Sequence, residues 1–262
     1  MQVLSDHFDL DSFFSDLKKS QKPILLLDYD GTLAPFKVKR DEAVPYPGVK
    51  EILNRILDAN HTHVVVISGR RVSDISDLLK LDIQPEIWGS HGNERLLSDG
   101  SYKLAELSEK ESEGLEKARK WAKEQKLDDN LEEKPAGLAF HWRGMDESRA
   151  EEIEKKVLYK WQPVQKEFNL KLLNFDGGIE IKVAGRDKGN AVRSVLMEFG
   201  ETDIIAYLGD DLTDEDAFKV LQGKGLCILV RNELRETLAD LWIEPPDELL
   251  HFLQRWHQVR SG

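Results

Sequence analysis

The sequence predicts a doubly wound α/β core that is interrupted by a smaller α+β domain. Two observations lead to this prediction. Short, wholly apolar segments alternate with helical patterns toward both ends of the chain, whereas the middle combines charged helices with strands of alternating polarity. Wholly apolar segments are typical of strands buried on both faces of a parallel sheet. Their regular alternation with helices is typical of an α/β fold.

The core strands are predicted where four or five consecutive residues are apolar, at 24–27, 64–67, 204–208 and 226–230. The core helices are predicted where apolar residues recur every three or four positions, at 49–57, 188–199 and from about 213 to 221. For the last helix, Thr213 followed by Asp216 predicts a capping box.

The middle of the chain predicts the inserted domain. Helices are expected over 106–126 and 146–161, and strands over 137–142, 170–175 and 179–183. In the last strand Ile179 and Ile181 face one way, while Glu180 and Lys182 face the other. Such half-exposed strands favour a sheet with one open face. We therefore predict a core of residues 1–97 and 178–262, with the insertion at 98–177.

The composition excludes several classes of protein. The 262 residues include 37 Lys plus Arg and 49 Asp plus Glu, a formal charge of −12, whose field would repel nucleic acid. No apolar segment approaches the roughly 20 residues of a membrane span, and the first residues lack the features of a signal peptide. The single cysteine, Cys227, excludes an intramolecular disulfide and is typical of a reducing compartment. We expect a cytoplasmic protein with neither nucleic-acid nor membrane partners.

Two carboxylates follow the first core strand. Asp28 and Asp30 are succeeded by Gly31 and Thr32, and ligands of parallel α/β sheets bind at the carboxyl ends of the strands. Asp-Gly is also an ordinary turn signal. The preceding apolar strand and the second acid favour a functional site over that alternative.

A second group of acids follows the strand at 204–208. Asp210, Asp211 and Asp214 lie close together in sequence and would repel one another unless a cation or water screened them. The alternative is an acid-rich first helical turn. That alternative suits Asp214 better than Asp210 and Asp211, which lie in the turn before the helix.

Two further features point to an anion site. Ser68, Gly69 and Arg70 follow the strand at 64–67, where a hydroxyl and main-chain N–H groups could hold a phosphate. Lys188 begins a helix, where the helix dipole disfavours a cation. Taken singly, the serine is more often a turn residue and the lysine a solvated surface residue.

Together these features carry a family resemblance. Asp28-x-Asp30-Gly31-Thr32, strand-end Ser68, helix-start Lys188 and Gly209-Asp210-Asp211, in this order, resemble the haloacid dehalogenase (HAD) superfamily of phosphohydrolases. Within it, Ser68-Gly69-Arg70, His91-Gly92 and Gly209-Asp210-Asp211-x-Thr213-Asp214-Glu215 resemble the trehalose-6-phosphate phosphatases. Glu132-x-Lys134 and His141-Trp142-Arg143 are similar to that family's cap. The resemblance runs from about Pro23 to the end and implies an HAD-like core with a C2B-type cap.

The resemblance implies a mechanism and a cofactor. Asp28 would attack phosphorus to form an aspartyl-phosphate, and Asp30 would serve as general acid and then general base. Ser68 and Lys188 would hold the phosphoryl oxygens. Mg²⁺ would be bound by Asp28, the Asp30 carbonyl and Asp210, with Asp211 or Asp214 acting directly or through water.

The resemblance also implies the substrate. We expect Mg²⁺-dependent hydrolysis of trehalose 6-phosphate. A separate synthase would supply this substrate and is a candidate partner. The residues predicted to contact substrate are Gly69, Arg70, His91, Glu132, Lys134, His141, Arg143 and Glu180. On an exposed strand, alternating charged residues of this kind also occur without any ligand.

The chain departs from the family pattern in two places. Glu180-Ile181-Lys182-Val183 stands where the family usually has Glu-x-Arg-Pro, and Trp142 stands where tyrosine is common. Sucrose phosphate, glucosyl- or mannosyl-phosphoglycerate and glucosylglycerol phosphate therefore stay open as substrates.

Two other reaction classes can be compared with hydrolysis. A dehalogenase on the same fold would keep Asp28 but has no evident need of Asp30, so the second acid favours phosphoryl transfer. A phosphomutase would need the aspartyl-phosphate to outlive reorientation of the product, and this alternative stays open. A catalytically inactive sugar-phosphate sensor would be expected to lack one of Asp28, Asp30, Lys188 and Asp210, and all four are present.

Overall fold

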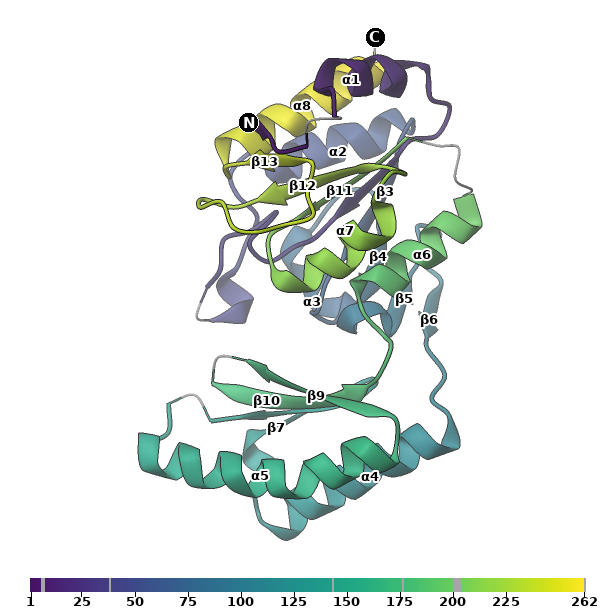
Figure 1. Cartoon of the computed structure of the whole chain (residues 1–262). Helices are drawn as coiled ribbons and strands as arrows, with labels where there is room; N and C mark the ends of the chain where they lie inside the picture. Colours follow the sequence, from purple (N-terminus) through teal and green to yellow (C-terminus); the bar gives the residue numbers. More distant parts are fainter. Residues whose placement is uncertain (6–7, 38, 143, 176, 200–203, 262) are drawn as a thin grey trace. The chain divides into compact units, whose positions relative to one another are not determined.

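The computed structural model describes residues 1–261 except 6–7, 38, 143, 176 and 200–203. The chain forms two compact units (Figure 1), here called the larger unit (Met1–Lys103 with Asp187–Gly262) and the smaller unit (Leu104–Arg186). The sequence placed the second boundary after residue 177. The difference is strand β10 (Gly178–Val183), which hydrogen-bonds to β8 (Gly137–His141) and β9 (Leu170–Phe175). Because its partners lie in the smaller unit, β10 belongs there.

A nine-stranded sheet forms the centre of the larger unit, in the order β1-β13-β12-β11-β2-β3-β4-β5-β6. The six strands from β13 to β4 run parallel, whereas β1 and β5 pair antiparallel with β13 and β4. The strands are β1 (Gln2–Val3), β2 (Ile24–Leu27), β3 (His63–Ile67), β4 (Glu86–Gly89), β5 (Glu94–Leu96), β6 (Tyr102–Leu104), β11 (Ile205–Gly209), β12 (Leu226–Val230) and β13 (Leu241–Ile243).

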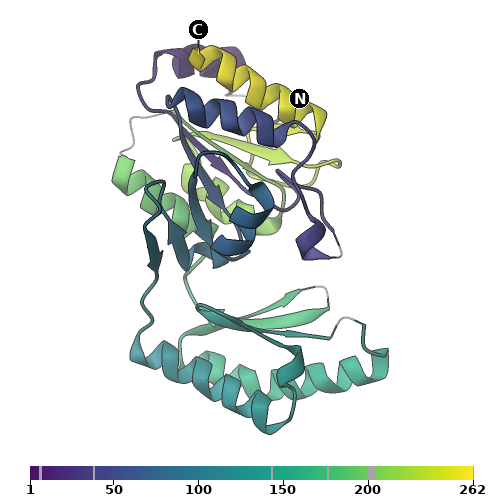
Figure 2. The ribbon, with the colours of Figure 1, turned by 180° about the vertical axis from the view of Figure 1, so that it is seen from behind.

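Helices cover both faces of this sheet (Figure 2). Alternate residues of a strand point to opposite faces, so Leu25 and Leu27 enter one apolar core and Ile24 and Leu26 the other. The first core is closed by α1 (Leu10–Lys19), α2 (Val49–Ala59), α3 (Val72–Leu79) and α8 (Asp247–Ser261). The second is closed by α6 (Lys188–Phe199) and α7 (Glu215–Leu221). The predicted doubly wound parallel core is confirmed.

The start of α7 differs from the sequence prediction. A 3₁₀ turn over Leu212–Asp214 precedes the helix, and the capping box joins Asp211 to Asp214 rather than Thr213 to Asp216. Asp211 accepts a hydrogen bond from the Leu212 N–H at 2.7 Å, and Asp214 accepts one from the Asp211 N–H at 3.0 Å. The predicted cap was wrong because Asp211 satisfies the first free N–H group two residues earlier.

The smaller unit has an antiparallel sheet in the order β7-β8-β10-β9, with β7 spanning Leu131–Lys134. Helices α4 (Glu109–Glu124) and α5 (Glu147–Glu167) lie side by side along one face of it (Figure 1). Leu115, Trp161, Phe140 and Ile181 are among the residues of the core between helices and sheet. The opposite face carries polar side chains from alternate positions.

A helix that crosses a membrane must be both long and apolar. The longest, α5, has 21 residues but includes many charged side chains. Among the residues that the structure describes, no helix joins sufficient length to sufficient apolar character to cross a bilayer.

Candidate active site

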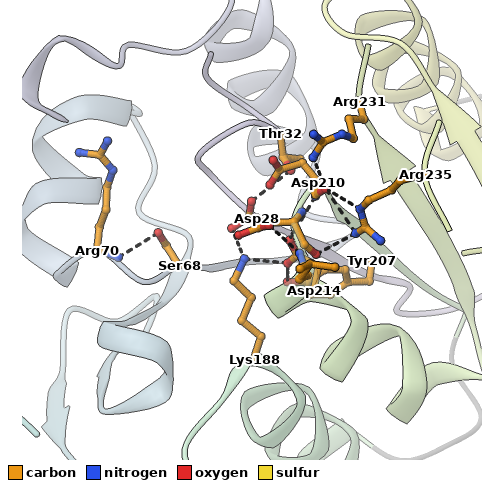
Figure 3. Close-up of polar contacts among 12 residues, drawn as sticks. Asp28, Thr32, Ser68, Arg70, Lys188, Tyr207, Asp210, Asp214, Arg231 and Arg235 are labelled. Atoms are coloured by element: carbon orange, nitrogen blue, oxygen red, sulfur yellow. Dashed lines mark hydrogen bonds and ion pairs between the residues drawn. The ribbon is translucent and has the colours of Figure 1, made fainter. Parts of the chain in front are cut away.

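Four predicted site residues lie along one edge of the larger sheet (Figure 3). Strand β2 lies between β3 and β11 and runs parallel to both. Its carboxyl end therefore places Asp28 between Ser68, which follows β3, and Asp210, which follows β11. Lys188, the first residue of α6, reaches the same place. The carboxyl edge of a doubly wound sheet is the usual place for a ligand.

Asp28 is held by hydrogen bonds to both carboxylate oxygens. The Lys188 Nζ donates to Oδ1 at 2.6 Å, and the Thr32 hydroxyl donates to Oδ2 at 3.1 Å. All three side chains are buried. Charge-assisted hydrogen bonds at this distance orient a carboxylate firmly, so the orientation of Asp28 is set before any substrate arrives.

Asp214 organises the loop after β11. Its Oδ1 accepts hydrogen bonds from Lys188 Nζ at 2.7 Å and from the Tyr207 hydroxyl at 2.6 Å. Its Oδ2 accepts from the main-chain N–H groups of Asp210 and Asp211, at 3.1 and 3.0 Å. Asp214 therefore connects the lysine, the end of β11 and the acidic loop.

Asp210 lies against the turn that follows Asp28. It is buried, and its Oδ1 has no hydrogen-bond partner among the described residues. Gly31 has φ +83°, and a Cβ there would lie 2.1 Å from Asp210 Oδ2. Only glycine readily adopts this backbone conformation and also lacks the Cβ that would collide with the Asp210 carboxylate.

The carboxylates of Asp28, Asp210 and Asp214 each offer an oxygen within 4.8 Å of the others. Among the described residues, Lys188 is the only cation hydrogen-bonded to these carboxylates. When all three carboxylates are ionised, the group has a net charge of about −2 in a buried place, which is costly without a counter-ion. An all-oxygen donor set with an unpartnered Asp210 oxygen fits a hard divalent cation. Asp211, by contrast, is exposed and accepts from the Leu212 N–H.

The same crowding shifts the titration of the site. Burial, followed by the charge of Asp214, raises the pKa of Asp28, although Lys188 partly offsets the effect. Burial and the neighbouring Asp28 raise the pKa of Asp210. Burial by itself would lower the pKa of Lys188, but Asp214 and Asp28 outweigh it and raise that pKa. Lys188 therefore remains an ammonium group.

Asp30 and Arg70 form an ion pair. Arg70 Nε donates to Asp30 Oδ2 at 2.7 Å and Nη2 donates to Oδ1 at 2.6 Å. The prediction that Arg70 contacts substrate stays a prediction. In this structure its guanidinium binds the proposed acid–base carboxylate.

The loop after β4 lies against Ser68-Gly69-Arg70. The Ser90 and His91 N–H groups donate to the carbonyls of Arg70 and Ser68, at 2.6 and 3.0 Å. Ser90 and His91 both have left-handed backbone conformations, with φ of 50° and 55°, which cost about 1–3 kcal/mol each. A Cβ on Gly69 would lie 2.6 Å from the His91 ring. The predicted Ser68, Gly69 and His91 are thus brought together.

Several residues of this site were not predicted from the sequence. Arg231 Nη1 donates to the Asp210 carbonyl at 3.3 Å, and Arg235 Nη2 donates to the Asp211 carbonyl at 2.9 Å. Tyr207 and Thr32 were not assigned roles either. Arg231 directly follows β12, so the same strand-end reasoning that found Asp28 and Ser68 could have found it.

The predicted residues of the smaller unit share one face of its sheet. The register pairs Glu132 with Ala139 and Ala139 with Glu180, which places these three side chains on the same side. Lys134 Nζ lies 3.1 Å from Glu180 Oε2, and His141 Nε2 lies 2.9 Å from Glu132 Oε2. The predicted Arg143 lies outside the described residues. Contact of this face with a sugar stays a prediction.

This chain is similar in sequence to one known protein family. The family model "Trehalose-phosphatase" matches residues 26–236. The chain is 30% identical to "Probable trehalose-phosphate phosphatase H" of Arabidopsis thaliana over 94% of its own length and 76% of the relative. It is also 30% identical to the trehalose-phosphate phosphatase of Mycobacterium leprae, over 97% of its own length and 62% of the relative.

Solved structures agree on the fold. The C-terminal domain of Candida albicans trehalose-6-phosphate phosphatase has a TM-score of 0.73 at 20% identity, and the match covers 100% of this chain and 99% of that one. A Bacteroides thetaiotaomicron phosphatase of the HAD superfamily has a TM-score of 0.62 at 18% identity, covering 97% of this chain and 99% of that one. The fold is that of the HAD phosphatases. With the family model matching most of its length, the chain belongs to the trehalose-phosphatase family.

Proposed function

We propose that this protein hydrolyses trehalose 6-phosphate to trehalose and phosphate through an aspartyl-phosphate on Asp28. The observation that supports it best is the buried group in which Lys188 joins Asp28 to Asp214 beside Asp210. Family membership supplies the substrate class. The group contains a nucleophile, a cation for phosphoryl oxygens and an oxygen-rich cation site.

In the first half of the reaction a carboxylate oxygen of Asp28 attacks phosphorus. The bond from phosphorus to the sugar oxygen breaks, and Asp30 gives its proton to that oxygen. Lys188 and Ser68 bind the phosphoryl oxygens, and the Lys188 charge reduces the repulsion between Asp28 and the incoming phosphate. Thr32 and Lys188 orient Asp28 for this attack.

In the second half water attacks the phosphorus of the aspartyl-phosphate. Asp30, now a carboxylate, takes a proton from that water, and the bond from phosphorus to Asp28 breaks. Inorganic phosphate leaves, and Asp28 returns to its hydrogen bonds with Lys188 and Thr32. One acid–base residue thus serves both steps.

Mg²⁺ fits the carboxylate group and would be held by Asp28, Asp210 and the main-chain carbonyl of Asp30, with Asp214 or Asp211 acting directly or through water. When bound, it supplies charge neutralisation at the transferring phosphoryl group. The Arg231 and Arg235 contacts to the carbonyls of Asp210 and Asp211 hold this loop in place.

The polar face of the smaller unit is proposed to recognise the sugar. Phosphate chemistry alone treats phosphomonoesters alike, so selectivity requires groups that contact the rest of the substrate. Lys134, Glu180, His141 and Glu132 share one face and are paired with one another. Donors and acceptors of this kind suit sugar hydroxyls. The substrate is proposed to come from a sugar-phosphate synthase, and one relative of this chain is named as such a synthase, from Dictyostelium discoideum.

The test is phosphate release, with and without Mg²⁺, from trehalose 6-phosphate, sucrose 6-phosphate, glucosyl- and mannosyl-phosphoglycerate, glucosylglycerol phosphate and glucose 6-phosphate. We expect trehalose 6-phosphate to exceed the others by orders of magnitude in kcat/KM. A different preferred substrate would leave the chemistry intact and overturn the sugar assignment, for which Lys182 and Val183 already depart from the family pattern.

The nucleophile has its own test. Asp28→Asn should abolish turnover of every substrate and prevent formation of an acid-stable phosphoenzyme, without changing the circular dichroism spectrum. Turnover near the wild-type level in this variant would exclude the aspartyl-phosphate.

A further inference from the structure

The carboxylate of Asp30 is held by one buried arginine. Arg70 donates one hydrogen bond to each Asp30 oxygen, at 2.6 and 2.7 Å. This is the bidentate geometry in which a guanidinium group recognises a carboxylate. Both oxygens of Asp30 therefore accept hydrogen bonds from the same side chain.

Arg70 itself is fixed by its surroundings. Its side chain is 4% exposed, against 27% for Asp30, and its guanidinium carbon lies 5.6 Å from the centre of the Tyr29 ring. Its main-chain N–H donates to the Ser68 hydroxyl at 3.1 Å, and its carbonyl accepts from the Ser90 N–H at 2.6 Å. The Arg70 backbone is therefore anchored at both its N–H and its carbonyl, and its guanidinium group is more enclosed than the Asp30 carboxylate that it binds.

We propose that Arg70 is the positioning residue of Asp30 and acts on the reaction only through that carboxylate. The inference rests on the proposed function, in which Asp30 moves the proton. The two hydrogen bonds fix the plane of the Asp30 carboxylate, so Arg70 sets the direction from which that carboxylate faces the substrate.

The two half-reactions use this pair in turn. As the bond from phosphorus to the sugar oxygen breaks, its electron pair stays on that oxygen, which takes the proton of Asp30. The resulting carboxylate accepts both N–H groups of Arg70. It then takes a proton from the attacking water as the bond from phosphorus to Asp28 breaks and the electron pair returns to Asp28. Arg70 keeps the Asp30 carboxylate oriented through both steps.

This role differs from substrate binding in its dependence on the leaving group. Arg70→Met should lower kcat/KM for trehalose 6-phosphate by about 10²-fold but that for p-nitrophenyl phosphate only slightly, because nitrophenolate leaves without a proton. Arg70→Lys keeps the charge but lacks the planar pair of donors, so it should show the same selective loss. If Arg70 had a purely structural role, its replacement would lower kcat/KM for both substrates by the same factor.

A double-variant cycle tests whether Arg70 acts through Asp30. Asp30→Asn should show the selective loss, and Asp30→Asn with Arg70→Met should be no worse than Asp30→Asn alone. The matched control is Arg71→Met, which removes the adjacent, exposed arginine. This variant should have the wild-type kcat/KM for both substrates. Melting temperatures verify folding, and Arg70→Lys serves if the methionine variant does not fold.

Three results would decide against parts of this scheme. If Arg70→Met lowers kcat/KM equally for both substrates, the positioning role of Arg70 is overturned. The same holds if the losses of the two single variants multiply in the double variant, a result that would favour direct substrate binding. If Asp30→Asn shows no selective loss, the acid–base role of Asp30 in the proposed function is itself wrong. The two failures are therefore distinguishable.

Discussion

The ammonium group of Lys188 lies 2.6 Å from Oδ1 of Asp28, although the two residues are 160 positions apart in the chain. Strand β2 delivers the aspartate and helix α6 delivers the lysine. A buried lysine is tolerated only when its charge is balanced, and a buried aspartate has the same requirement. The two groups therefore stabilise one another's charged form at the point where a phosphate would arrive.

Removing this lysine should affect both activity and stability. Lys188→Met is expected to lower kcat by about 10²–10³-fold, the range for loss of one charge-stabilising donor. It also leaves buried carboxylates without their cation, which should cost about 3–5 kcal/mol of unfolding free energy. Steady-state kinetics and urea denaturation measure the two effects. Lys219→Met, on an exposed position of α7, is the control, and an equal effect there would contradict the assignment.

Divalent cation binding should stabilise the fold. Because the carboxylates of Asp28, Asp210 and Asp214 converge, Mg²⁺ at about 100 times its Kd should add about 2.7 kcal/mol of unfolding free energy, seen as a rise in melting temperature that EDTA reverses. Asp210→Asn should abolish the rise.

A nearby acid outside the proposed cation site provides the control for that experiment. Asp216 is exposed on α7, so Asp216→Asn should keep most of the Mg²⁺-dependent rise. The cation site is misassigned if the two variants respond alike, or if calorimetry detects Mg²⁺ binding to Asp210→Asn at wild-type affinity.

Lys134 should matter for the sugar and not for the phosphate chemistry. Lys134→Ala removes the partner of Glu180, 3.1 Å away, and is expected to lower kcat/KM for trehalose 6-phosphate far more than for p-nitrophenyl phosphate. Lys155→Ala removes an exposed lysine on α5 and should leave kcat/KM for both substrates unchanged. Equal losses on the two substrates would place Lys134 outside the sugar site.

Stability should also depend on a buried carboxylate outside the proposed active site. Glu86 accepts hydrogen bonds from Trp88 Nε1 at 2.6 Å and Arg95 Nε at 2.7 Å, and contacts His63 Nε2 at 2.9 Å. Burial by itself would raise the pKa of Glu86, but the hydrogen bonds from His63 and Arg95 outweigh it and lower the pKa below the ordinary value of 4.5.

A lowered pKa in the folded state gives stability that is present above the unfolded value and lost as the pH falls through the folded value. The unfolding free energy should therefore decrease as the pH falls below 4.5. Glu86→Gln should cost about 1–3 kcal/mol at neutral pH and flatten this part of the profile. Glu233→Gln, at an exposed position, should leave it unchanged. An identical pH profile for Glu86→Gln and wild type would show that the network does not contribute.

The sequence alone predicted the parts of this protein that depend on local pattern. Wholly apolar strands, helical spacing and polar residues at strand ends are readable from neighbours in the chain. The edge of a parallel sheet collects strand ends, so Asp28, Ser68 and Asp210 could be placed together without coordinates. Lys188 stood out because a cation at a helix start is unfavourable, but a single lysine there is more often solvated, and only the structure showed that it is buried.

The tertiary structure decided which groups contact one another. Nothing local shows that Arg70 binds Asp30, that Tyr207 binds Asp214, or that Arg231 reaches the Asp210 carbonyl, because such side-chain pairs join segments far apart in the chain or depend on how a loop folds back. Strand β10 follows a turn and could pair with either sheet by its alternation alone, so its place in the smaller unit depended on hydrogen bonds to β8 and β9. The sequence determined which chemical groups are present, and folding determined which of them are neighbours.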